Sequence, residues 1–138
     1  MAMPNVFVDT SGFFALLVQR DPAHKRAVQL VSEWQLVGRQ TFTSDYIVDE
    51  TATLLKMRGH GSLLSSFFSL LDSSEALGLV FVDEERFGKT KEFLLKHQDH
   101  GYSFTDCSSF LLMKQFGSTE SLTTDVHFRE AGFRALLI

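Results

Sequence analysis

The chain has 138 residues, of which 44% are hydrophobic and 22% are charged, and this composition is typical of one globular domain, expected to span residues 1–138. No apolar run approaches the roughly 20 residues of a membrane-spanning helix, and no basic segment followed by an apolar one opens the chain, so we expect a cytoplasmic protein with no membrane partner. One cysteine excludes an internal disulfide, and a net charge of −4 argues against nucleic-acid binding by bulk electrostatics alone, although local basic patches stay open.

The chain opens with a short apolar run that ends on a carboxylate. Residues 6–8 show no alternation of polar and apolar side chains, which predicts a strand buried on both faces, as in a parallel sheet. Asp9 follows at the carboxyl end of this strand, where loops and helix N-termini converge in open α/β sheets. A helix through residues 13–17 is predicted next, with Thr10 or Ser11 as its cap. Asp9 is therefore the first candidate functional residue.

Helical and strand patterns then alternate along the chain. Residues 23–37 carry apolar side chains at helical spacing, and residues 41–43 form a short β-prone run. Ser44 and Asp45 are expected to cap the next helix, which carries Glu50 in its first two turns.

A further helix is predicted over residues 63–71, and it is apolar almost all round. Such a helix needs two burying partners, so it belongs either to the deep core or to an interface with a subunit or partner protein. Residues 79–82 predict a second buried strand, and the acids that follow suit the N-terminus of a helix that we expect to run to His100.

The last third of the chain repeats the opening pattern. Thr105 is a plausible cap for a helix over residues 107–116, with Asp106 in its first turn. Residues 121–125 predict a short strand that ends on Asp125, and residues 132–138 can supply a last strand. Strands alternating with helices, without repeats or linkers, predict an α/β fold: a three-layer domain with a mainly parallel central sheet flanked by helices.

Four acids occupy positions that a parallel sheet would bring to one edge: Asp9, Glu50, Asp106 and Asp125. Each alone is more simply explained as a helix cap or a solvated loop residue. Together they would repel one another by roughly 4 kcal/mol per pair at ~4 Å, so converging carboxylates would need cations. Carboxylate oxygens without a His or Cys cluster suit Mg²⁺ or Mn²⁺. Such an ion lowers the pKa of bound water and stabilises charge on a phosphoryl oxygen, which indicates phosphodiester hydrolysis.

Four segments resemble, in order, the motifs of PIN-domain ribonucleases of the VapC toxin type. They read VFVDTSGFFALL from residue 6, TSDYIVDE from residue 43, SFTDC from residue 103 and TTDVHFREAGF from residue 123. Each piece is weak by itself, but four acidic motifs in sequence with the closing His-Phe and Gly-Phe are fairly specific, and they span nearly the whole chain. The resemblance implies a PIN-like, Rossmann-like fold.

The resemblance also implies a function and a set of site residues. Asp9, Glu50, Asp106 and Asp125 would form a catalytic site that holds Mg²⁺ or Mn²⁺, with Asp9 and Asp106 as the firmest metal ligands. The family hydrolyses RNA phosphodiester bonds and usually works as a homodimer, and its toxin branch is silenced by a cognate antitoxin. Substrate contacts are expected from Thr10, Ser11, Thr105, His127 and Arg129.

Two positions complicate this assignment. Val126 stands where relatives often carry a basic residue after the fourth aspartate, which leaves one substrate contact in doubt. Asp49 lies beside Glu50, and adjacent residues of a helix point about 100° apart, so only one of the two can face the site. Glu50 matches the family motif better.

The sequence favours other functions less, although one alternative within the same family stays open. A catalytically idle α/β module would bind proteins through residues 63–71, but the retention of four acids counts against it, while a housekeeping PIN nuclease without antitoxin stays open. A haloacid-dehalogenase-like phosphatase would need Asp-x-Asp after the first strand, and a response-regulator receiver a further acidic pair and a late lysine; neither is evident. Cys107 is better explained as a buried residue than as a nucleophile. His97 and His100 fit a helix C-terminus better than a metal site.

Overall fold

A five-stranded sheet forms the centre of the computed structural model, which describes residues 4–138. The strand order is β3-β2-β1-β4-β5, and every neighbouring pair is parallel. The strands are β1 (Val6–Val8), β2 (Thr41–Ser44), β3 (Leu77–Val80), β4 (Glu120–Leu122) and β5 (Arg134–Ala135). The predicted α/β class with a parallel central sheet is therefore confirmed.

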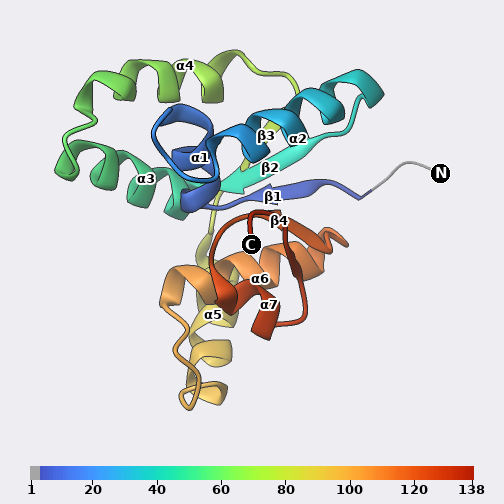
Figure 1. Cartoon of the computed structure of the whole chain (residues 1–138). Helices are drawn as coiled ribbons and strands as arrows, with labels where there is room; N and C mark the ends of the chain where they lie inside the picture. The colour runs from blue at the N-terminus through green and yellow to red at the C-terminus, as the bar shows by residue number, and fades with distance from the viewer. Residues whose placement is uncertain (1–3) are drawn as a thin grey trace.

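Helices cover both faces of this sheet. Within residues 4–138 they are α1 (Thr10–Leu17), α2 (His24–Val37), α3 (Asp45–Met57), α4 (Leu64–Ser73), α5 (Glu84–Lys96), α6 (Phe104–Gln115) and α7 (Val126–Glu130), with a 3₁₀ turn at Gly61–Leu63. Figure 1 shows α1 to α4 on one side of the sheet and α5 to α7 on the other, which gives the predicted three layers. None of these helices combines the length and the apolar composition that crossing a membrane requires.

The central strand β1 fixes the position of the candidate site. All three of its side chains are buried, because β1 is a central strand between β2 and β4 and helices cover both faces of the sheet there. The chain moves from β1 outward to β2 and β3, and then crosses over to β4 on the opposite side. The strand order therefore reverses between β1 and β4, and in open α/β sheets ligands bind in the crevice outside the carboxyl ends of the strands at such a point.

Phenylalanines fill much of the core around this strand. The Phe7 ring lies 5.2 Å from that of Phe42 and 6.3 Å from that of Phe128. Phe110 of α6 packs edge-on against Phe128 of α7 at 5.0 Å. These contacts hold α6 and α7 against the lower face of β1 and β4, so the acids at their N-termini are carried to the switch point.

Two predicted apolar elements are less buried than the sequence indicated. The strand predicted over residues 79–82 is β3, which starts two residues earlier and lies at the sheet edge, where Leu79 is 40% exposed. An edge strand has a neighbour on one side only, so its apolar run is covered incompletely. In α4, predicted over residues 63–71, Phe67 is fully buried but Phe68 is 43% exposed. The deep-core explanation for this helix is therefore wrong.

Several helix ends also differ from prediction. Asp9, not Thr10 or Ser11, occupies the N-cap position of α1, and Ser103, not Thr105, caps α6. The helix expected to run to His100 is α5, which ends at Lys96. The short helix α7 was not predicted at all, since its five residues are too few for a periodic apolar pattern.

Candidate active site

Asp9 lies at the carboxyl end of β1 and is 7% exposed. It occupies the N-cap position of α1, yet its side chain makes no capping hydrogen bond, so the carboxylate points elsewhere. Glycine at position 12 permits a close approach between α1 and β4, because a Cβ there would overlap the carbonyl oxygen of Leu122. The first turn of α1 can therefore lie directly against the end of β4.

Thr123 connects Asp9 to the loop that carries Asp125. Its Oγ1 donates to Asp9 Oδ2 at 2.8 Å and accepts from the Asp125 backbone N–H at 3.0 Å. Ser11 Oγ lies 3.0 Å from Thr123 Oγ1 and accepts from the Thr124 backbone N–H at 2.9 Å. This network holds the ends of β1 and β4 in one fixed arrangement.

Asp106 and Asp125 come from the opposite face of the sheet. Asp106 is the third residue of α6 and forms a capping box with Ser103: its Oδ2 accepts from the Ser103 N–H at 3.0 Å, and Ser103 Oγ accepts from the Asp106 N–H at 2.9 Å. Asp125 caps α7 by accepting from the His127 backbone N–H at 2.9 Å. Both acids are thus positioned by the helices that they begin.

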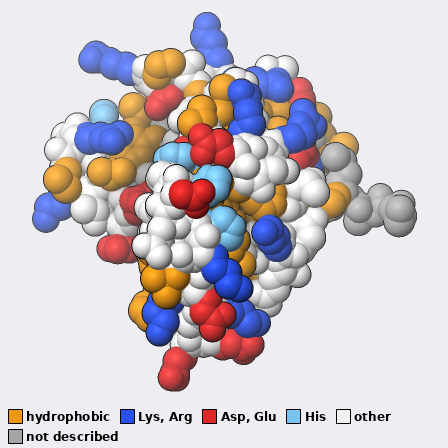
Figure 2. Space-filling model, turned by 90° about the horizontal axis from the view of Figure 1, so that it is seen from below, with side chains coloured by type: hydrophobic (Ala, Val, Ile, Leu, Met, Phe, Trp, Pro, Cys, Tyr) orange, Lys and Arg blue, Asp and Glu red, His pale blue; other side chains and the backbone are white. Residues whose placement is uncertain are grey.

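The imidazole of His127 lies between these two carboxylates. Its Nδ1 is 3.3 Å from Asp106 Oδ2 and 3.2 Å from Asp125 Oδ1. Within residues 4–138, these three side chains form the only group of His, Cys, Asp and Glu residues whose ligand atoms could share a metal ion, all within 4.8 Å of one another. On the face shown in Figure 2, acidic and histidine side chains lie side by side near the middle.

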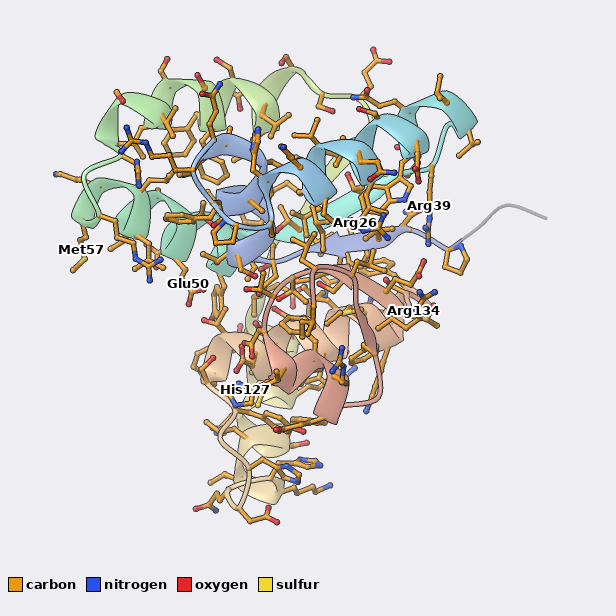
Figure 3. All side chains as sticks on the ribbon, viewed as in Figure 1. Arg26, Arg39, Glu50, Met57, His127 and Arg134 are labelled. Atoms are coloured by element: carbon orange, nitrogen blue, oxygen red, sulfur yellow. The ribbon has the colours of Figure 1, made fainter. Side chains whose placement is uncertain are left out.

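Glu50 approaches the same place from α3. It projects from that helix toward the half of the molecule in which His127 lies (Figure 3), and its negative charge contributes to the raised pKa of Asp9. Asp49, its neighbour, is exposed, and no charge of Asp49 is among the causes of that pKa shift. That Glu50 rather than Asp49 belongs to the acidic group stays a prediction, which the charge of Glu50 on Asp9 supports.

The electrostatics of the group favour a bound cation. The pKa of Asp9 rises from 3.8 to about 7, chiefly because its side chain is buried; the hydrogen bonds from Thr123 and the Thr10 backbone oppose this rise, and the charges of Asp106 and Glu50 contribute to it. Burial also raises the pKa of Asp106, as does the charge of Asp125. A positive ion would relieve the cost of ionising these carboxyls. Asp9 thus interacts electrostatically with Asp106 and Glu50, and Asp106 with Asp125, whereas the group whose ligand atoms could share one ion contains Asp106 and Asp125 but neither Asp9 nor Glu50.

A hard divalent ion fits the donor set. The carboxylate oxygens of this group suit Mg²⁺ and Mn²⁺, whereas its imidazole is a more usual ligand of Zn²⁺, and adjacent ligands of an octahedral ion at roughly 2.1 Å lie about 3 Å apart. The separations of His127 Nδ1 from Asp106 Oδ2 and Asp125 Oδ1, 3.3 and 3.2 Å, come close to this spacing. The site is therefore compatible with the divalent ion that the family resemblance implies.

The residues predicted to contact the substrate fall into two groups, some hydrogen-bonded within the protein and others open to solvent. Thr10 is buried and its Oγ1 accepts from Thr51 Oγ1 at 3.3 Å, while the Ser11 hydroxyl belongs to the Thr123 network. Both hydroxyls are engaged within the protein, so substrate binding by them stays a prediction. Thr105 borders an open groove, and Arg129 is exposed.

The contacts that two residues make with the acids were not predicted from the sequence. His127 was expected to contact RNA phosphates, and its contact with two carboxylates was missed; its place two residues after Asp125 was the available signal. Thr123 was missed as a hydrogen-bond donor to Asp9, and no local pattern indicates that contact. Cys107 is fully buried, and burial raises the pKa of its thiol, as expected for a core residue.

The crossover order of the sheet places acids after β1 and β4 at its switch point, and the PIN-domain family model matches residues 6–134. The chain belongs to this family. Among its relatives is the 23S rRNA-specific endonuclease VapC20 of Mycobacterium tuberculosis, which is 33% identical over 129 residues, covering 93% of this chain and 95% of VapC20. A VapC ribonuclease of Archaeoglobus fulgidus is 29% identical over 114 residues, covering 78% of this chain and 69% of the relative.

Solved structures agree with this assignment. The crystal structure of M. tuberculosis VapC20, described as a sarcin–ricin-loop-cleaving toxin, superposes with a TM-score of 0.82 at 29% identity, covering 94% of this chain and 96% of VapC20. FitAcB from Neisseria gonorrhoeae shares the fold, with a TM-score of 0.61 at 16% identity and 94% of both chains covered. The resemblance to VapC-type ribonucleases found in the sequence is therefore confirmed.

Proposed function

We propose that this chain is an endoribonuclease that uses Mg²⁺ or Mn²⁺ to hydrolyse a phosphodiester bond of ribosomal RNA, and that residues 1–138 act as one PIN domain. The observation that carries the proposal is the acidic group at the switch point of the sheet, where Asp106 and Asp125 could share a metal ion with His127 and where the charges of Asp106 and Glu50 act on Asp9. The RNA class is suggested by VapC20, a 23S rRNA-specific endonuclease that aligns with 93% of this chain.

In this proposal the four acids divide the work. Asp9, Asp106 and Asp125 would hold the metal. When bound, the ion would supply a water of lowered pKa and neutralise charge on the attacked phosphoryl oxygen. The Glu50 carboxylate would take the proton of the attacking water. A bond forms between the water oxygen and phosphorus, the bond from phosphorus to one ribose oxygen breaks, and that oxygen takes a proton from solvent.

Positioning residues keep the first carboxylate ready for this role. The O–H of Thr123 donates to Asp9 Oδ2, which stabilises the ionised form of a buried acid. The reciprocal hydrogen bonds of the capping box with Ser103 fix the orientation of the Asp106 side chain. Because these contacts are preformed, little rearrangement is needed when the metal and the RNA arrive.

The test is cleavage of a defined RNA by purified protein. A synthetic sarcin–ricin-loop hairpin and intact ribosomes would be incubated with Mg²⁺, with Mn²⁺ and with EDTA. We expect cleavage with either ion, none with EDTA, and a loss of at least about a hundredfold in Asp9→Asn. The control, Asp72→Asn, changes an exposed acid of α4 and should leave the rate unchanged. Cleavage that survives both EDTA and Asp9→Asn would refute the proposal.

The proposal extends to regulation and assembly. We propose a homodimer that acts in the cytoplasm, where ribosomes are found, and that is silenced by a cognate antitoxin; VapC20 is itself described as a toxin. Expression of the chain alone should arrest growth, and co-expression of the neighbouring open reading frame should restore it. Growth that is unaffected by the active protein would favour a housekeeping nuclease of the same fold. Sedimentation velocity would measure the oligomeric state.

A further inference from the structure

A groove of about 410 Å³ opens beside the acidic group. Its walls come from α3 and from the first turn of α6, and the residues that line it are Tyr46, Asp49, Glu50, Thr53, Leu54, Phe104 and Thr105. Glu50 belongs to both the groove and the acidic group, and Thr105 precedes Asp106 in the chain. An RNA strand whose phosphate lies at the acids would therefore place an adjacent nucleotide at this groove.

Aromatic rings form one side of the groove. The Tyr46 ring lies 6.0 Å from that of Phe104, and Phe104 in turn lies 5.3 Å from Phe87, which is 48% exposed. Tyr46 and Phe104 are both only partly buried. Aromatic faces next to a nuclease centre are suited to stacking, because every base has a π-face and unpaired bases of RNA are commonly held this way.

The polar side of the groove indicates which part of a nucleotide fits. Its charged members, Asp49 and Glu50, are acids, so a phosphate would be repelled there while a neutral base would not. Asp49 is exposed and its carboxylate can only accept hydrogen bonds. Adenine, cytosine and guanine offer amino donors to such an acceptor, whereas uracil presents mainly carbonyl oxygens along the same edge.

From this geometry we infer that the groove between α3 and α6 binds one unpaired base next to the cleaved phosphate, with Tyr46 and Phe104 stacking on the base and Asp49 selecting an amino-bearing base over uracil. The inference rests on the proposed function and names its base-binding site. It also assigns Asp49, a residue whose place relative to the acidic group was open from the sequence, to substrate selection rather than to the metal.

The test measures binding separately from cleavage. Fluorescein-labelled hexauridine, and versions with one central adenosine, cytidine or guanosine, would be titrated with metal-free protein in EDTA and followed by anisotropy. We expect the three amino-bearing oligonucleotides to bind several-fold more tightly than hexauridine. An oligonucleotide with a central 2-aminopurine should lose fluorescence on binding, because stacking on a ring quenches this base.

Matched variants assign the effect to the groove. Tyr46→Leu and Phe104→Leu keep apolar volume but lose the ring, and each should weaken binding about tenfold and abolish the quenching. Phe104→Tyr should retain both, and Phe68→Leu, a change at a more exposed ring on α4, should have no effect. Asp49→Asn should remove the preference over uridine, while Asp72→Asn should not.

The outcomes separate this inference from the proposed function. Equal binding by Tyr46→Leu, Phe104→Leu and wild type, or no binding of any oligonucleotide, would overturn the base site even if the protein cleaves RNA. Variants that change the sedimentation coefficient but not RNA binding would show that a second copy of the chain occupies the groove, which would also overturn it. Ring-dependent binding without metal-dependent cleavage would support the base site and refute the nuclease.

Discussion

Replacing Asp9 with asparagine should stabilise the metal-free protein while abolishing cleavage. Asp9 is 7% exposed, and burial together with the charges of Asp106 and Glu50 raises its pKa from 3.8 to about 7. An asparagine keeps the shape and an oxygen that can accept from Thr123, but it carries no charge. The folded protein therefore no longer has to hold an ionised carboxylate in a buried position at neutral pH.

The size of this effect follows from the two pKa values. Because the folded-state pKa is the higher one, the folded protein binds the proton more tightly, and ionisation of Asp9 destabilises it increasingly as pH rises from about 3.8 to about 7. At 1.36 kcal/mol per pKa unit, the destabilisation is about 1 kcal/mol at pH 4.5 and about 4 kcal/mol at pH 8. For a chain of this size the larger value corresponds to roughly 10–15 °C in Tm.

Urea unfolding of wild type and Asp9→Asn in EDTA, between pH 4.5 and 8, measures this difference directly. The free energies of unfolding should differ by about 1 kcal/mol at pH 4.5 and by about 4 kcal/mol at pH 8, with the variant more stable. Adding Mn²⁺ should then stabilise wild type more than the variant, because only a state that binds the ion gains from it. A variant that is equally or less stable at pH 8 in EDTA would show that the carboxylates do not converge as described.

Three further predictions test the scaffold and the chemistry. Gly12→Ala should cost about 3 kcal/mol in urea unfolding, since its Cβ would overlap the Leu122 carbonyl, whereas Gly88→Ala, with open space around it, should be neutral or slightly stabilising. Glu120→Ala should lower the free energy of unfolding by about 3–5 kcal/mol, because it leaves Arg39, whose side chain is 6% exposed, without its 2.7 Å ion pair. Recovery of this stability in a double variant with Arg39→Met would confirm the cause. A 2′-deoxy substitution at the cleavage position should still permit cleavage, and a cyclic phosphate detected by mass spectrometry would contradict attack by water.

The parts of the fold with strong local signals were predicted from the sequence. The strand at residues 6–8 could be predicted from its apolar run alone. A central parallel strand is buried on both faces, so all of its side chains are apolar whichever strands lie beside it. Ser44 was recognised as a cap, and its side chain accepts from the Ile47 N–H at 3.2 Å. Residue type and position within a few residues are sufficient for such features.

Features that depend on distant neighbours could not be predicted. The apolar run of residues 77–82 fits a strand in more than one register, and the choice of β3 at 77–80 depends on pairing with β2. Its exposure depends on its place at the edge, which no local pattern reports. The bond from Thr123 to Asp9 joins residues 114 apart in the chain, so it appears only once β4 is known to lie beside β1.

Helix capping and the candidate site turn out to share residues. From the sequence, a cap and a functional carboxylate were competing explanations for each acid, but Asp106 completes the capping box of α6, Asp125 caps α7, and both also face His127. The hydrogen bonds with Ser103 in the capping box lower the pKa of Asp106 and so oppose the rise that burial and the charge of Asp125 cause. Replacing either residue with alanine would remove the cap together with the charge. Asparagine, which still accepts from a backbone N–H, is the substitution that separates a loss of chemistry from a loss of structure.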